Sequence, residues 1–174
     1  ETAIDVCNLY KIKKIVLVGA EDALKVSDKI KENNISIILN RIHRLPKNED
    51  ENIYAPFSQA KKLSELGILY CLSYEGDMEA MGARNLPFTA GTTVAYGLDY
   101  ELAVQSISLN AAKILGVDNK IGSIEINKEA TFFISDGDAL DIRSNNVTHI
   151  FIKGNSISTD NHQKRLFNKY RKNK

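Results

Sequence analysis

Residues 14–19 read Lys-Ile-Val-Leu-Val-Gly and residues 35–40 read Ile-Ser-Ile-Ile-Leu-Asn, and these two apolar runs decide the fold. A continuous apolar run of this length, bounded by glycine or asparagine, is typical of a strand that is buried on both faces. Between the runs, residues 21–33 place Ala23, Leu24, Ser27 and Ile30 at helical spacing. The unit is therefore strand, helix, strand, and a helical crossover of this length predicts that the two strands are parallel.

A third unit follows after a long polar connection. Ala55 to Leu66 has the spacing of a helix, and Gly67 stands where a helix C-cap commonly takes glycine. Ile68 to Leu72 is then a third apolar run. We expect the three runs to be parallel neighbours in one α/β sheet. Residues 100–115 predict a further helix whose apolar stripe faces the core.

The chain changes character after Gly116. Short apolar segments separated by Asp-Gly and Asn-Asn pairs, which tolerate positive φ, predict a small β lobe. The expected strands are residues 120–125, 130–135, 139–142 and 147–152, and a final helix over residues 160–170 is expected to pack through Leu166, Phe167 and Tyr170. We therefore divide the chain into residues 1–116, a β lobe at 117–159, and a C-terminal helix and tail at 160–174.

The composition argues against several classes of function. The 174 residues include 23 Lys+Arg and 22 Asp+Glu, a net charge of +1, so no broad basic surface invites nucleic acid. No apolar stretch approaches the roughly 18 residues that span a bilayer. We expect neither a nucleic-acid partner nor a membrane partner. The turn at residues 19–22 also lacks the glycine pattern of phosphate-binding loops, which disfavours an independent nucleotide-binding domain.

Four polar residues that follow the second and third runs are the candidate substrate-binding residues: Arg41, His43, Glu75 and Asp77. Loops after the carboxyl ends of parallel strands commonly build ligand sites. Arg41 suits a carboxylate, and His43 suits proton transfer or ligation. The two acids suit water positioning or cation binding. A hydrogen bond that fixes the loop is the structural alternative for His43, and ordinary exposed charge is the alternative for the acids.

The stretch from residue 85 to residue 130 carries a resemblance. A helix ending Asn-Ala-Ala-Lys-Ile-Leu-Gly at residues 110–116 leads into Ile-Gly-Ser-Ile-Glu at residues 121–125, and a Lys-x-Ala step follows at 128–130. In these motifs the chain resembles the amidohydrolase superfamily, in particular its imidazolonepropionase-like members. The resemblance implies a (β/α)₈ barrel and a β sandwich assembled from both chain ends. It implies that residues 1–116 supply the last three strand–helix units of that barrel, a partial barrel, because a complete one takes about 250 residues.

The resemblance also implies a metal centre, which this sequence does not complete. Active members resemble one another in an early His-x-His pair, further histidines at strand ends, and an aspartate after the last strand, which hold one or two divalent metals. This sequence contains no His-x-His. Val18 stands where a strand-end histidine is expected, and Ser73 or Tyr74 stands where the aspartate is expected. We expect no metal or other cofactor in this chain, zinc or another divalent metal in an active full-length parent, and we leave the catalytic residues open.

Two functional hypotheses follow from the resemblance. The first is a C-terminal portion of an enzyme that hydrolyses C–N bonds in small, often cyclic, amides, inactive as this chain alone. The second is a non-catalytic module that binds a small molecule and has kept the barrel but lost the metal. The expected partners are a small-molecule substrate, the missing N-terminal portion of the same protein, and a second copy, because an incomplete parallel sheet leaves unpaired edges. Location in the cytoplasm or export to the periplasm stays open.

Overall fold

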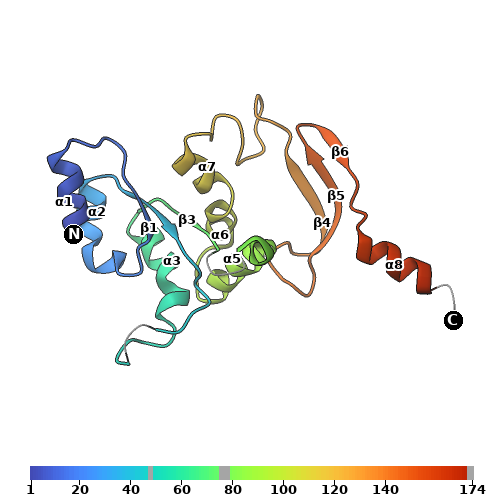
Figure 1. The fold of residues 1–174 in the computed structure, drawn as a ribbon, viewed down its shortest axis with the longest axis horizontal. Helices are drawn as coiled ribbons and strands as arrows, with labels where there is room; N and C mark the ends of the chain where they lie inside the picture. The colour runs from blue at the N-terminus through green and yellow to red at the C-terminus, as the bar shows by residue number, and fades with distance from the viewer. Residues whose placement is uncertain (47–48, 75–78, 172–174) are drawn as a thin grey trace.

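The three apolar runs form one parallel sheet. Strands β1 (Val16–Gly19), β2 (Ser36–Leu39) and β3 (Tyr70–Leu72) lie in the order β1-β2-β3, with every pair parallel. The prediction of three parallel neighbours is therefore confirmed. The computed structural model describes residues 1–46, 49–74 and 79–171, and Figure 1 shows this sheet in the N-terminal half of the molecule with helices around it.

Helices of the first 116 residues pack around this sheet. The 3-10 helices are η1 (Ala23–Val26) and η2 (Ala83–Asn85), and the α-helices are α1 (Thr2–Leu9), α2 (Ser27–Glu32), α3 (Ala55–Glu65), α4 (Glu79–Gly82), α5 (Leu86–Ala95), α6 (Tyr100–Ser106) and α7 (Leu109–Leu115). Helices α3, α5, α6 and α7 contact β3. Ile37 and Leu39 of β2 and Leu63 of α3 are almost fully buried. By contrast, Val18 of β1 is 66% exposed, so this edge strand is open to solvent in the described part of the chain.

The two ends of the parallel strands carry connections of different length. At the amino edge, α2 ends at Glu32 and β2 begins at Ser36, while α3 ends at Glu65 and β3 begins at Tyr70. At the carboxyl edge, the chain runs from Leu39 to Ala55 before the next helix. The long connection after β2 therefore lies at the carboxyl edge, where the sequence predicted the candidate site.

A second sheet lies on the other side of α5 and α6 (Figure 1). Strands β4 (Phe132–Asp136), β5 (Asn146–Ile152) and β6 (Asn155–Ile157) are antiparallel and lie in that order. Helix α8 (His162–Arg171) follows and stands away from both sheets. The packing predicted for it is wrong in this structure, because Leu166, Phe167 and Tyr170 are 40%, 62% and 61% exposed. Among the described residues, no helix has both the length and the apolar character needed to cross a membrane.

Two predicted strands are wrong, because their backbone groups bond within turns. In residues 139–142, the Asp138 carboxylate accepts the Leu140 N–H at 2.8 Å, and the Asn145 amide donates to the Ala139 carbonyl at 3.0 Å. In residues 120–125, the Lys120 and Ile121 N–H groups both donate to the Val117 carbonyl. A backbone group bonded within its own turn is not free for a sheet ladder.

Two helix predictions also change in detail. The helix expected over residues 100–115 is interrupted, since Ser108 has φ −134° and ψ −89°. The hydroxyls of Ser106 and Ser108 donate to carbonyls in the preceding turn, both at 2.7 Å, and such bonds favour a break in a helix. The helix expected over residues 21–33 is a 3-10 turn followed by the short α2.

Candidate functional site at the strand ends

The turn after β1 is fixed from the helix that packs beneath it. Gln59 of α3 is 5% exposed, and its amide donates to the carbonyls of Ala20 and Glu21, each at 3.1 Å. Ala20 has φ +46°, a conformation that residues other than glycine rarely adopt. The two hydrogen bonds compensate for that unfavourable backbone geometry and hold the end of β1 in place.

The segment after β2 is anchored by three consecutive side chains. Ile42 is 2% exposed and belongs to the core. The ring nitrogen Nε2 of His43 lies 2.8 Å from Oγ1 of Thr92 in α5, and the guanidinium of Arg44 lies 3.3 Å from the Glu21 carboxylate. These anchors fix the backbone immediately after Arg41, which is itself exposed.

Arg41 meets an aromatic ring from the neighbouring strand end. Its guanidinium carbon lies 5.7 Å from the ring centroid of Tyr74, which follows β3. The Tyr74 ring also lies against Gly82 of α4, where an added Cβ would overlap the ring. A cation over an aromatic face is attracted by the ring quadrupole and keeps its planar N–H groups available. The carboxyl edge thus presents a cationic, planar hydrogen-bond donor on an aromatic support.

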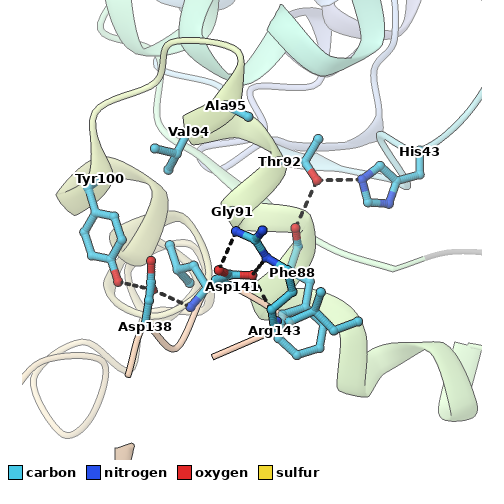
Figure 2. A pocket seen from close by; sticks show the side chains of 12 residues that line it. His43, Phe88, Gly91, Thr92, Val94, Ala95, Tyr100, Asp138, Asp141 and Arg143 are labelled. Carbon is cyan, nitrogen blue, oxygen red and sulfur yellow. Dashed lines mark hydrogen bonds and ion pairs between the residues drawn. The ribbon is translucent and has the colours of Figure 1, made fainter. Parts of the chain in front are cut away.

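The structure separates the candidates that the sequence grouped. Arg41 lies at the strand ends against Tyr74, whereas His43 points towards α5 (Figure 2). Glu75 and Asp77 lie outside the residues that the structure describes. The role of Tyr74 beside Arg41 was not found from the sequence, where this residue appeared only as a strand-end position that lacks the expected aspartate.

The hydrogen-bond network favours one tautomer of His43. The Thr92 hydroxyl donates to the Phe88 carbonyl at 3.0 Å, so its proton is already engaged. In this arrangement His43 donates from Nε2 to the Thr92 oxygen, which leaves Nδ1 as the acceptor in the neutral ring. Partial burial, and secondly the positive charge of Arg41, lower the pKa of His43. The ring is therefore held in its neutral form more strongly than in an unfolded chain.

The described strand ends do not offer ligands for a divalent metal. The positions at and just after the ends of the strands are Val18, Gly19, Asn40, Ser73 and Tyr74, and none is a histidine, a cysteine or a carboxylate. In the described part of the chain, no group of three or more His, Cys, Asp or Glu side chains is placed to hold a metal ion. The donor set of the described strand ends therefore does not fit the metal centre that the resemblance implied.

A separate pocket of about 530 Å³ lies between α5 and the segment 138–143 (Figure 2). Its apolar wall comprises Phe88, Val94, Ala95, Leu140 and Ile142, and its polar side chains are His43, Thr92, Tyr100, Asp138, Asp141 and Arg143. The Tyr100 hydroxyl donates to the Asp138 carboxylate at 2.7 Å. Sequence reasoning missed this pocket, since nothing in the local pattern links residues 100 and 138.

Parallel strand–helix units with polar side chains at their carboxyl ends define an α/β protein of the barrel or open-sheet type. The family follows from the match of residues 5–157 to the model of the amidohydrolase family. The chain belongs to the amidohydrolase family. The resemblance stated from the sequence is thereby confirmed.

Curated relatives and solved structures agree with this family. The chain is 31% identical over 85 residues to an imidazolonepropionase from Syntrophobacter fumaroxidans, which covers 48% of this chain and 19% of that protein. It is 46% identical over 41 residues to an imidazolonepropionase from Shewanella frigidimarina. The crystal structure of an amidohydrolase from Thermotoga maritima superposes with a TM-score of 0.76 at 24% identity, over 90% of this chain and 40% of that one. The chain thus spans less than half the length of these proteins, and the last likeness concerns the fold alone.

Proposed function

We propose that this chain forms the substrate-recognition part of a metal-dependent amidohydrolase that cleaves C–N bonds in small, often cyclic, amides. The observation that carries the proposal is the meeting of Arg41 and Tyr74 at the carboxyl edge of three parallel strands. In barrels and open α/β sheets this edge builds the active site. Family membership and the partial match to two imidazolonepropionases support the reaction class.

In this proposal residues 1–116 are the last three strand–helix units of a (β/α) barrel. Residues 117–159 are a sandwich-type lobe, and residues 160–174 are a terminal helix and tail. The remaining strands come from another portion of the same protein, which pairs with the open edges of β1 and β3. Without that portion, the same edges favour association between copies of this chain.

Arg41 would bind the substrate, and Tyr74 would hold the guanidinium in a usable orientation. A guanidinium offers parallel N–H donors that match a carboxylate or two neighbouring carbonyl oxygens. The stack on Tyr74 limits the rotamers of Arg41, which reduces the entropy lost when a ligand binds. Glu75 and Asp77, which follow β3, remain proposed substrate contacts. His43 takes part through its free Nδ1 acceptor or through the anchoring of the segment that bears Arg41.

We propose that zinc or another divalent metal is held by residues outside the described strand ends. A metal of this kind supplies an activated water for attack on an amide carbonyl. The described part of this chain contributes binding and orientation to that reaction, and the chain alone is expected to be inactive.

The test compares two proteins: the chain alone, and a longer protein in which the chain is preceded by the polypeptide encoded upstream of Glu1. Both proteins are supplied with zinc and assayed for hydrolysis of a panel of cyclic amides, half of which carry a carboxylate. We expect turnover only from the joined protein, with a preference for the carboxylate substrates. Arg41→Ala should reduce kcat/KM for those substrates by about 10- to 100-fold, and Arg165→Ala on α8 is the matched control.

Three outcomes separate the hypotheses. Turnover by the chain alone contradicts the proposal that this chain supplies substrate recognition and another portion supplies the metal. Binding of the panel by the joined protein without turnover favours the non-catalytic module. Turnover that is indifferent to Arg41→Ala removes the recognition role of Arg41 and leaves the reaction class standing.

A further inference from the structure

The pocket between α5 and the segment 138–143 has an unbalanced charge. Among its twelve lining residues, the charged side chains are Asp138, Asp141 and Arg143, because His43 is held neutral by its surroundings. Arg143 makes two hydrogen bonds from its guanidinium to Asp141, at 3.2 and 3.1 Å, so these two charges neutralise each other. The pocket is left with the single negative charge of Asp138.

The Asp138 carboxylate is oriented by two neutral donors. Its Oδ1 accepts the Tyr100 hydroxyl at 2.7 Å and the Leu140 N–H at 2.8 Å. Both bonds use the same oxygen, and among the described residues no cationic side chain forms an ion pair with this carboxylate. These contacts fix the direction of the group without cancelling its charge. Figure 2 shows Tyr100 and Asp138 on one side of the pocket and His43 with Thr92 on the other.

The wall between these polar groups is apolar. Phe88, Val94, Leu140 and Ile142 line it. Gly91 of α5 lies against the Leu140 carbonyl so closely that a Cβ there would overlap it, which locks the segment 138–143 onto the helix. A volume of about 530 Å³ falls within the range of small-molecule pockets. The shape and charge together suit a ligand with an apolar body and a positive end.

We propose that this pocket is a second ligand site, separate from the strand ends, and that it binds a small organic ammonium compound with an apolar or aromatic body. The ammonium group donates to Asp138, and the body lies along Phe88 and the aliphatic wall. The aromatic faces of Phe88 and Tyr100 add to the attraction for a cation. The proposal does not depend on the reaction assigned to the strand ends, because His43 is the one residue of the pocket that also belongs to that site.

The site is coupled to the strand ends through the backbone. His43 forms one wall of the pocket, and Arg41 lies two residues before it. A ligand that packs against the His43 ring therefore restrains the segment that carries Arg41. Occupancy of the pocket is expected to change the affinity for a ligand at the strand ends, and a ligand at the strand ends should change the affinity of the pocket by the same factor.

The probes are three compounds with the same aromatic body: phenethylamine, 2-phenylethanol and 3-phenylpropionate. Binding to the intact protein is measured by ligand-observed NMR and by titration calorimetry near neutral pH. We expect phenethylamine to bind about tenfold more tightly than the alcohol, and the carboxylate to bind least.

Asp138→Asn is the decisive variant, because asparagine keeps the acceptor for Tyr100 and Leu140 but removes the charge. It should abolish the difference in affinity between the amine and the alcohol. Asp118→Asn, which removes a charge outside the pocket, should preserve that difference. Unchanged melting temperatures exclude loss of fold as the cause. The proposal is overturned if amine and alcohol bind equally, if neither binds, or if the amine preference survives Asp138→Asn.

Discussion

The guanidinium of Arg41 lies over the ring of Tyr74, with its carbon 5.7 Å from the ring centroid, although the two residues follow different strands. The contact exists because β2 and β3 are parallel and end at the same edge. Gly82 of α4 lies against the same ring, so that an added Cβ would overlap it. The candidate site is therefore built by three segments, and a change in any one of them should affect the other two.

Removing the ring should weaken binding at the strand ends without altering a chemical step. Tyr74→Leu deletes a cation–π contact worth about 0.5–1 kcal/mol at an exposed site. We expect KM to rise about two- to fivefold with kcat little changed, or Kd to rise equally if the protein binds without turnover. Tyr10→Leu at an exposed position is the control. An equal loss in kcat would point to a direct role for the Tyr74 hydroxyl.

Adding a methyl group at Gly82 should destabilise the fold through the same ring. Gly82→Ala forces the Tyr74 ring to move, and overpacking of this kind costs about 1–3 kcal/mol. In a Tyr74→Ala background the cost should disappear, which a double-mutant cycle in urea would measure. If the close approach were unimportant, alanine in this helix would instead stabilise the protein by up to about 1 kcal/mol.

The Gln59 amide should be needed for the turn after β1. Gln59→Met removes both donors and leaves two carbonyls unpaired, with an expected loss of about 1–3 kcal/mol in the free energy of unfolding. Gln59→Glu should be worse at neutral pH, because a buried carboxylate would face two carbonyl oxygens. Chemical denaturation measures the order of stability of these variants, and Gln163→Met on the exposed α8 is the control. Equal stability of the Met variant would show that water replaces the amide.

His43 should make the free energy of unfolding decrease as the pH falls below about 6.5. Burial and the Arg41 charge lower its pKa in the folded state, so the unfolded chain binds more protons between the lowered pKa and about 6.5. Stability should therefore be complete above about pH 6.5 and should fall as the pH drops through this window. His43→Gln, which keeps a donor for Thr92, should flatten this part of the profile. His149→Gln is the matched control, and a profile unchanged by His43→Gln would contradict the argument.

The sequence predicted the parallel sheet because buried strands leave a local signal. The runs Ile15 to Gly19 and Ile35 to Asn40 needed no knowledge of distant partners, and the polar loop after β2 correctly located Arg41 near the strand ends. The strands predicted at 120–125 and 139–142 failed because short apolar segments look alike in strands and in turns. Residues 139–142 form a turn because the Leu140 N–H donates to Asp138, and residues 120–125 do so because the Lys120 and Ile121 N–H groups donate to the Val117 carbonyl. The other bond of Asp138, from Tyr100, depends on tertiary structure.

The same limit explains what was missed in the candidate site. His43 was correctly recognised as a residue of the strand-end loop, but its direction depends on Thr92 in a helix that the local pattern does not connect to that loop. In the sequence, Tyr74 was noted only as a position where the expected aspartate is absent. Its contact with Arg41 could be predicted only with knowledge of the register between β2 and β3. Positions along the chain were predictable, whereas contacts between separate loops were not.

The unequal connections at the two sheet edges have a consequence for how such a chain can diversify. Short joints before β2 and β3 leave few positions where a substitution spares the core. The longer connection from Leu39 to Ala55 is anchored at its start by contacts with the core, with α5 and with Glu21. Its exposed residues can therefore be exchanged while those contacts stay in place. A library of variants confined to that connection should therefore yield many folded proteins with altered ligand preference, and a library of equal size at the opposite edge should yield few.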